Sequence, residues 1–181
     1  LGGVRNMKAP SLRDPLEIRG TRIEGRIAAA PLATASADHD GKPTPRSLEI
    51  YRRIAGSGVD LVVVEHHAVC RKGRARVAQF RLDSDETAEA AGSLAKVFLE
   101  EGCPALVQIN HAGSQARDEA LLAEKYAFLA PSEVKNPACA LSVKPRPMDA
   151  GEIASSVEAF AAAARRALKA GYRGVQVHCC H

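Results

Sequence analysis

The sequence predicts an α/β fold in which parallel strands are covered by the helices that connect them. A unit that consists of an amphipathic helix, a glycine and a short apolar run occurs three times along the 181 residues. The apolar runs do not alternate with polar residues, which is typical of strands that are buried on both faces. Helices and strands in alternation indicate βαβ units and a parallel sheet.

The first unit is expected to begin at Thr44, an N-cap residue that is followed by Pro45, whose missing N–H costs nothing at the first helical position. Gly56 ends this helix, and the strand at 59–64 is followed directly by Glu65. Helical spacing places four apolar residues on the face that we expect to lie against the sheet: Leu48, Tyr51, Ile54 and Ala55.

The second unit begins at Ser84 or Asp85, either of which can cap a helix, and this helix stops at Gly102. The strand at 104–109 follows and carries Gln108 near its end. The expected core face of the helix is Ala91, Leu94 and Phe98.

The third unit begins at Asp149, which has Glu152 three residues later, the spacing of a capping box. The helix ends at Gly171, and the strand at 174–177 leads to His178. The apolar face that helical spacing predicts for the core is Ile153, Val157, Phe160, Ala164 and Leu168.

Two further elements precede these units, and a long segment interrupts them. Residues 27–30 form a fourth apolar run that ends at Pro31, and residues 18–23 are expected to form a small hairpin that turns at Gly20. The segment at 112–148 is longer than a usual connection between a strand and a helix. We therefore expect it to serve as a functional lid or to carry extra short elements.

The positions of the polar residues favour a barrel over a doubly wound sheet. Glu65, Gln108 and His178 lie at the carboxyl ends of their strands, where the catalytic groups of a (β/α)₈ barrel project. A dinucleotide-binding sheet needs a glycine-rich turn after its first strand, and residues 31–36 contain no glycine. Because a complete barrel has eight strands and about 250 residues, the sequence predicts a partial (β/α)₈ TIM barrel, made of the first four strands and an N-terminal β-hairpin.

Residues 14–181 are expected to form this half-barrel, and residues 1–13 to be disordered or vector-derived. The net charge of +4 comes from charges spread along the chain, so no nucleic-acid partner is expected. No apolar run reaches the roughly 20 residues of a membrane span, and no signal peptide is visible, so we expect a cytoplasmic protein without a membrane partner. The five cysteines show no repeated CxxC spacing and predict no disulfide framework.

Six motifs in this order resemble the Old Yellow Enzyme family, including its enoate reductase and dienoyl-CoA reductase branches. They lie at residues 25–34 (GRIAAAPLAT), 40–44 (DGKPT), 64–74 (VEHHAV, then GR), 108–113 (QINHAG), 130–132 (APS) and 170–181 (AGYRGVQVHCCH). The resemblance covers nearly the whole chain from about Asp14.

This resemblance implies a flavoenzyme with FMN across the mouth of the barrel and NADH or NADPH as reductant. His66 would contact the flavin, and Gln108 would hydrogen-bond its pyrimidine portion. The catalytic residues His178 and His181 would hold the oxygen of a small-molecule, enone-like substrate. A homo-oligomer is left open. One edge of the flavin would be lined by the segment after the first strand: Pro31, Leu32, Ala33 and Thr34.

The sequence departs from the family pattern at four positions. His66 stands where a small residue usually meets the flavin, and Gly25 replaces the usual Asn. Ser114 stands where Arg is common, and Arg173 replaces a frequent Asp.

Two other functions stay open on the residues alone. His178 and His181 could bind a metal ion in a barrel hydrolase, although neighbouring strand residues face opposite ways, so one ion could not collect the whole 178–181 run. A half-barrel with unpaired edge strands could also be an inactive remnant. Glu65 is expected to brace neighbouring loops, and His111 to form a structural hydrogen bond rather than to catalyse.

Overall fold

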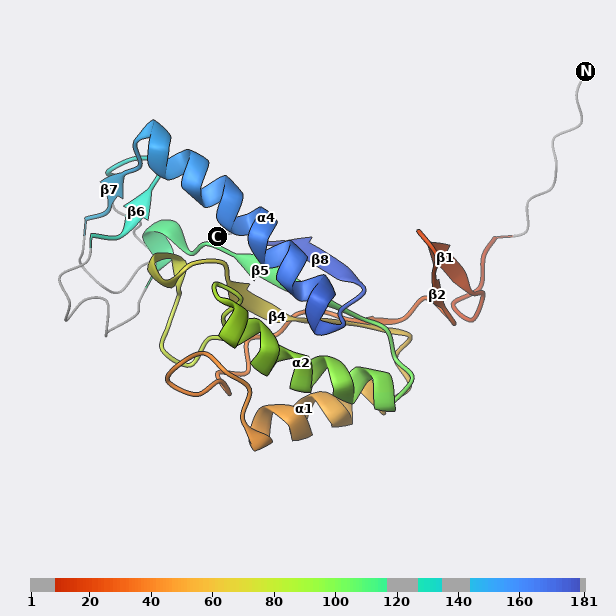
Figure 1. Ribbon diagram of the computed structural model, residues 1–181. Helices are drawn as coiled ribbons and strands as arrows, with labels where there is room; N and C mark the ends of the chain where they lie inside the picture. Colours follow the sequence, from red (N-terminus) through yellow and green to blue (C-terminus); the bar gives the residue numbers. More distant parts are fainter. Residues whose placement is uncertain (1–8, 117–126, 135–143, 180–181) are drawn as a thin grey trace, which may run out of the picture.

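Four parallel strands form the sheet that positions the site. The computed structural model describes residues 9–116, 127–134 and 144–179 (Figure 1). The strands are β3 (Ala28–Ala29), β4 (Leu61–Ala68), β5 (Ala105–Asn110) and β8 (Gly174–Val177), and they pair in this order. Every pairing is parallel, so the predicted four-stranded parallel sheet is confirmed.

The first strand is shorter than predicted. β3 holds only two of the residues 27–30, because Ile27 N–H donates to the Asp60 carboxylate at 2.9 Å rather than to a backbone oxygen of the neighbouring strand. Ile27 is half exposed at this edge.

The second strand is longer than predicted and contains a β-bulge. β4 continues three residues past Glu65, because His67 pairs with Ile109 and Ala68 pairs with Asn110 of β5. The register shifts between Val64 and His67, so one extra residue of β4 lies opposite β5 there.

Three helices, α1 (Pro45–Ala55), α2 (Asp85–Glu100) and α4 (Ala150–Ala170), lie side by side against the sheet (Figure 1). Each begins with a capping box, in which the N-cap side chain accepts from a backbone N–H one turn ahead: Thr44, Ser84 and Asp149. Ser84 is therefore the cap of α2, and Asp85 is its first residue. α4 ends at Gly171, whose φ of 108° suits glycine.

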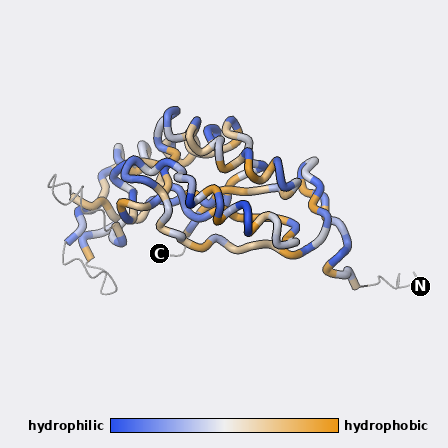
Figure 2. Tube along the Cα trace, turned by 90° about the horizontal axis from the view of Figure 1, so that it is seen from below, coloured by the Kyte–Doolittle hydropathy of each residue, from blue (hydrophilic) through white to orange (hydrophobic). Residues whose placement is uncertain are grey.

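The hydrophobic core lies between the sheet and these helices. Figure 2 shows hydrophobic stretches along the central strands, whereas the helices alternate between hydrophobic and hydrophilic residues. Burying each large apolar side chain contributes about 1.5–3 kcal/mol. The fully buried residues of this cluster include Val64 of β4, Leu94 of α2, Val107 and Ile109 of β5, and Phe80 and Leu82 from the loop after β4.

The predicted core face of the last helix is wrong in part. Ile153, Val157 and Leu168 are 52%, 66% and 58% exposed, and α4 instead buries Ala163 and Ala167. The helix packs against α2 on one side, and among the described residues no strand pairs with the outer edge of β8. Of the predicted face, only Phe160 and Ala164 are half-buried, and the two alanines that α4 buries fully lie outside the predicted set.

The predicted hairpin is confirmed and consists of β1 (Leu16–Ile18) and β2 (Thr21–Ile23), which pair antiparallel. Arg19 and Gly20 form the turn, with φ of 46° and 77°. Two central residues with positive φ match the right-handed twist of a hairpin. Figure 1 shows the hairpin beyond the end of the sheet from which β4 and β5 start.

The predicted domain boundary at residue 14 falls in a segment that is partly described. Residues 1–8 lie outside the described residues, whereas the Leu12 carbonyl accepts a hydrogen bond from Arg26 N–H at 2.9 Å. Residues just before the predicted boundary thus contact the chain that leads into β3.

The long segment between β5 and α4 carries short elements, one of the two alternatives expected for it. They are η2 (Gly113–Gln115), β6 (Leu129–Ala130) and β7 (Arg146–Pro147), and β6 pairs with β7. A further 3₁₀ turn, η1 (Arg71–Gly73), follows β4.

Candidate active site

The carboxyl ends of the strands meet at one rim, because all four strands are parallel and pair in order. Thr34, from the segment after β3, donates its N–H to the Glu65 carboxylate of β4. His178, directly after β8, donates its N–H to the Ile109 carbonyl of β5 at 3.0 Å. The structure therefore brings the segment after Pro31, the ends of β4 and β5, and His178 to the same edge of the sheet.

The rim segment, residues 31–36, leaves β3 without regular secondary structure. Leu32 (77%) and Ala33 are exposed, Pro31 and Thr34 are half-buried, and Ser36 is buried. Ala35 has a φ of 50°, a left-handed conformation that costs a residue with a Cβ about 1–2 kcal/mol. The segment presents an apolar edge to its surroundings while its polar residues lie further inside.

The Glu65 carboxylate is the polar centre beneath this segment. It is 1% exposed and accepts hydrogen bonds from Thr34 N–H at 3.0 Å, from the Thr34 hydroxyl and from Tyr51 O–H at 3.1 Å. Burial raises the pKa of this carboxyl, and the hydrogen bonds from Thr34 and Tyr51 oppose that rise. Glu65 thus joins the rim segment to α1, in agreement with its expected bracing role.

Two carboxamides lie side by side on neighbouring strands. Gln108 is 7% exposed, and its Nε2 donates to Gln176 Oε1 at 2.7 Å. The two residues are direct partners in the parallel register of β5 and β8. Together they offer amide donors and acceptors to a heterocycle. Gln176 was not predicted as a site residue, although it stands in the motif at 170–181, two residues before His178.

Two imidazoles meet above these strands. The rings of His66 and His178 are nearly parallel, with 6.1 Å between centroids and 18° between planes. His178 is half-buried. His66 belongs to the bulge in β4, and its ring lies on the same side of the sheet as that of His178. The predicted flavin contact and the predicted substrate ligand are therefore neighbours. His181, the other predicted substrate ligand, lies outside the described residues.

The next residue, His67, belongs to the core. It is fully buried, its Nδ1 lies 2.7 Å from the Glu65 carbonyl oxygen, and its ring stacks on Phe80 with centroids 4.9 Å apart. Burial lowers the pKa of His67 to about 4, so the ring is neutral near pH 7. Among the described residues, its Nε2 has no hydrogen-bond partner.

His111 and Gln79 support the rim from behind. His111 accepts a hydrogen bond from Gly113 N–H at 3.1 Å, and burial lowers its pKa, which fits the structural role expected for it. Gln79 donates to the carbonyl of His66 at 3.2 Å and to Asn110 Oδ1 at 2.7 Å. Gln79 lies in a loop without a recognisable motif, so the sequence offered no signal for it.

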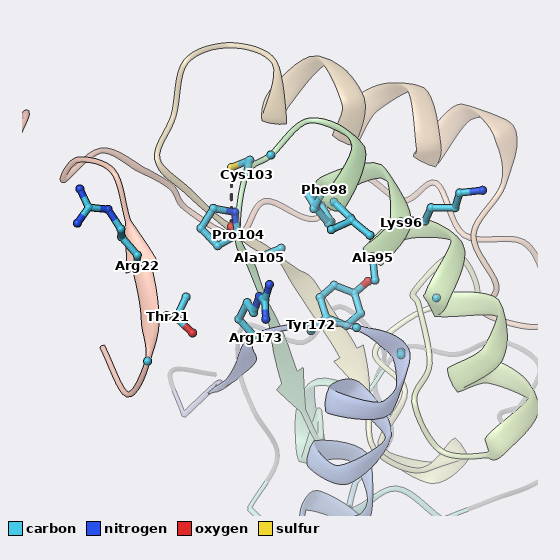
Figure 3. Close-up of a pocket in the computed structure, with 16 residues that line it drawn as sticks. Thr21, Arg22, Ala95, Lys96, Phe98, Cys103, Pro104, Ala105, Tyr172 and Arg173 are labelled. Carbon is cyan, nitrogen blue, oxygen red and sulfur yellow. Dashed lines mark hydrogen bonds between the residues drawn. The ribbon is translucent and has the colours of Figure 1, made fainter. Parts of the chain in front are cut away.

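A cavity of about 510 Å³ lies at the opposite end of the strands (Figure 3). Its lining includes Phe98 and Tyr172 from the core side, and Cys103 and Arg173, which come before β5 and β8. This cavity is separate from the rim that carries the histidines and the glutamine pair.

In the described ranges, no helix is long and apolar enough to cross a membrane. Within the same ranges, which end before Cys180 and His181, no three side chains of the metal-binding types gather in one place.

Comparison with known proteins identifies the family. Residues 11–181 match the NADH:flavin oxidoreductase / NADH oxidase family. An NADH oxidase of Thermoanaerobacter brockii is 32% identical over 173 residues, which cover 95% of this chain and 26% of that enzyme. An NADPH dehydrogenase of Geobacillus sp. is 30% identical, with 94% of this chain and 48% of that enzyme covered.

A solved structure shows the same architecture. The old yellow enzyme homologue from Zymomonas mobilis aligns with a TM-score of 0.80 and 26% identity over 93% of this chain and 48% of that chain. The predicted partial barrel is thereby confirmed, and the chain spans about half the length of that structure. The family match supports the predicted FMN and NADH or NADPH as the cofactors of this group of proteins. From its sequence motifs, its four-stranded half-barrel and these matches, the chain belongs to the NADH:flavin oxidoreductase / NADH oxidase family, of the Old Yellow Enzyme type.

Proposed function

We propose that the complete protein is an FMN-dependent NAD(P)H oxidoreductase that reduces activated C=C bonds, such as those of α,β-unsaturated carbonyls, or related acceptors. The observation that carries this proposal is the rim at which an apolar segment, an amide pair and an imidazole pair come together. The chain spans about half the length of the Geobacillus relative, so the activity is proposed for the whole polypeptide.

The donor set of the rim fits an isoalloxazine ring. Leu32 and Ala33 offer an exposed apolar edge, which a flat aromatic group would cover. Gln108, held by Gln176, offers an amide to the polar pyrimidine portion. Pro31 and Thr34 flank this edge, and their predicted contacts with the flavin belong to the same proposal.

The histidines are proposed to orient the substrate. Bound FMN, reduced by NADH or NADPH, supplies a hydride at its N5 atom. His178 would donate a hydrogen bond to the carbonyl or nitro oxygen of the acceptor and so withdraw electron density from its C=C bond. The ring of His66 lies nearly parallel to that of His178. The predicted contact of His66 with the flavin belongs to the same proposal. His181 would donate a second hydrogen bond to the same oxygen of the acceptor, a role that rests on its motif alone.

This proposal includes a small-molecule substrate, no nucleic-acid or membrane partner and a cytoplasmic location. NADH oxidase and NADPH dehydrogenase are the names of the relatives, and both reductants are therefore candidates.

The full-length protein tests the proposal. We expect a yellow preparation with a flavin spectrum that bleaches with NADH or NADPH without oxygen and recovers when 2-cyclohexenone is added. His178→Ala should slow the recovery by about 10²-fold or more, because an oxyanion donor is lost, and should leave the bleaching step largely intact. A colourless preparation that contains stoichiometric zinc would overturn the proposal in favour of a metal-dependent hydrolase.

A further inference from the structure

We infer that Glu65 is a positioning residue that holds the rim segment, residues 31–36, in the conformation that meets the cofactor. The cofactor part of this inference rests on the proposed function. The holding part rests on the contacts of Glu65, Tyr51, Thr34 and Ser36 and on the backbone of Ala35.

With Glu65 ionised, the hydrogen-bond directions around it follow from counting protons. The Tyr51 hydroxyl accepts from Glu65 N–H at 3.0 Å, so its own proton is available to Glu65 Oε1 at 3.1 Å. An ionised carboxylate only accepts, which suits the three donors that surround it. The side chain of Tyr51 therefore fixes both the backbone and the carboxylate of Glu65.

The same count extends into the rim segment. Thr34 has one hydroxyl proton, and it points to Glu65 Oε1. The Ser36 hydroxyl, 2.6 Å from Thr34 Oγ1, must then donate to Thr34. The Ser36 carbonyl accepts from the hydroxyl of Thr44, the N-cap of α1, at 2.8 Å. A chain of hydroxyl groups thus runs from Ser36 through Thr34 to Glu65, and Glu65 sets its direction.

Ala35 shows that this network holds the backbone in a strained form. It lies between Thr34 and Ser36 and has a φ of 50°, although it has a Cβ. A left-handed alanine persists where its surroundings hold it. Both neighbours of Ala35 are held by the network, whereas Leu32 and Ala33 are exposed and contribute little packing.

Replacement of the Glu65 carboxylate by a carboxamide should therefore release the segment. In Glu65→Gln, a carboxamide N–H₂ replaces one carboxylate oxygen. It then faces either the Thr34 N–H, at the Oε2 position, or the hydroxyls of Thr34 and Tyr51, at the Oε1 position, so the contacts cannot all persist. Ala35 would then leave its left-handed conformation, and the edge formed by residues 31–34 would lose its shape. Ala35→Gly should offset this change, because glycine adopts positive φ without strain.

Hydrogen exchange tests the holding part without a flavin. Amide exchange of residues 32–36 is measured in the full-length protein and its Glu65→Gln variant, with Glu89→Gln on the exposed face of α2 as a matched control. We expect exchange at Thr34 to be about tenfold faster or more in Glu65→Gln, from the loss of charged hydrogen bonds, and unchanged in the control. Unchanged exchange at Thr34 in Glu65→Gln would overturn the inference. If that variant does not fold, Thr34→Val removes the hydroxyl contact alone and must accelerate exchange in the same residues.

FMN binding tests the cofactor part. We expect the Kd for FMN to rise about tenfold or more in Glu65→Gln. In the Glu65→Gln, Ala35→Gly double variant, the Kd should return most of the way to that of the unsubstituted protein. A rise in Kd without recovery in the double variant would show that Glu65 acts in another way than by holding Ala35. If the unsubstituted protein binds no FMN, the proposed function fails, and the exchange data still decide whether Glu65 holds the segment.

Discussion

The centre of the sheet and its outer side differ in how completely they are covered. At the centre, Val64 of β4 and Val107 of β5 have no exposed surface and belong to one core cluster with side chains of α1 and α2. At the outer side, α4 and β8 leave Val157 and Val177 more than half exposed. The comparison teaches that one half-barrel can build a core of its own while its last βα unit stays incomplete.

The largest expected effect concerns the ligand. Because only half of a barrel wall is present, we expect the isolated chain to show no saturable quenching of flavin fluorescence at micromolar FMN. The full-length protein, titrated in parallel, should show it. Saturable binding by the isolated chain would mean that the rim alone is enough to bind FMN. The incomplete outer side of the sheet would then have no effect on the ligand.

A core substitution should have the next largest effect. Phe98 is 3% exposed and contacts the rings of Tyr51 and Tyr172, with centroids 5.8 and 6.4 Å away. Phe98→Ala should lower the free energy of unfolding by about 3–5 kcal/mol, since it leaves a cavity. Urea denaturation monitored by circular dichroism measures this change. A loss below about 1 kcal/mol would mean that the centre is not well packed.

Acid should destabilise the centre through His67. The pKa of His67 is about 4 in the folded chain and 6.5 in the unfolded chain. As the pH falls, the unfolded chain therefore takes up the proton before the folded chain does. Stability is therefore unaffected above pH 6.5 and falls as the pH drops from 6.5 to 4, by about 3 kcal/mol in total.

His67→Gln, which does not titrate, should flatten this slope in denaturation curves measured between pH 4 and 7. The raised pKa of the Glu65 carboxyl acts in the opposite sense, because its protonation favours the folded state. An unchanged slope in His67→Gln would contradict the assignment of a neutral, buried His67.

The helix cap on the outer side should contribute less. Asp149 accepts from Glu152 N–H at 2.8 Å, and the Glu152 carboxylate accepts from Asp149 N–H at 3.0 Å. Asp149→Ala should lower the thermal unfolding midpoint by an amount that corresponds to about 1 kcal/mol, and Asp149→Asn should retain most of the stability. Equal losses in both variants would show that the charge, and not the cap, matters.

The smallest effect is expected on the exposed face of α4. Val157→Ser should change the unfolding free energy of this chain by no more than about 0.5 kcal/mol, because the side chain is 66% exposed. In the full-length protein the same substitution should cost more if further elements cover that face. Similar small effects in both proteins would mean that α4 stays exposed.

The sequence predicted the features that local chemistry decides. The caps Thr44 and Asp149, the turn at Gly20 and the stop at Gly171 depend on side chains and backbone within one turn of the chain. The parallel order followed from runs of apolar residues that are buried on both faces. The site residues at strand ends could be placed at one rim for the same reason.

The remaining features depend on contacts between distant segments. The bulge in β4 depends on pairing with β5, the partner of Gln108 depends on the register between β5 and β8, and the strain at Ala35 depends on Glu65. The exposed side of α4 could not be predicted either, because spacing identifies an apolar face but not which half of it a neighbour covers.

The bulge between Val64 and His67 separates two adjacent histidines by environment. With it, His66 lies beside His178, and His67 aligns with Ile109 and lies in the core. If β4 paired regularly beyond Val64, His66 would align with Ile109 and His67 with Asn110, so the two histidines would exchange faces. Phe80 would then lose the ring that stacks on it, and His178 would lose its neighbour. The extra residue therefore lets one strand supply one imidazole to the rim and the next to the core.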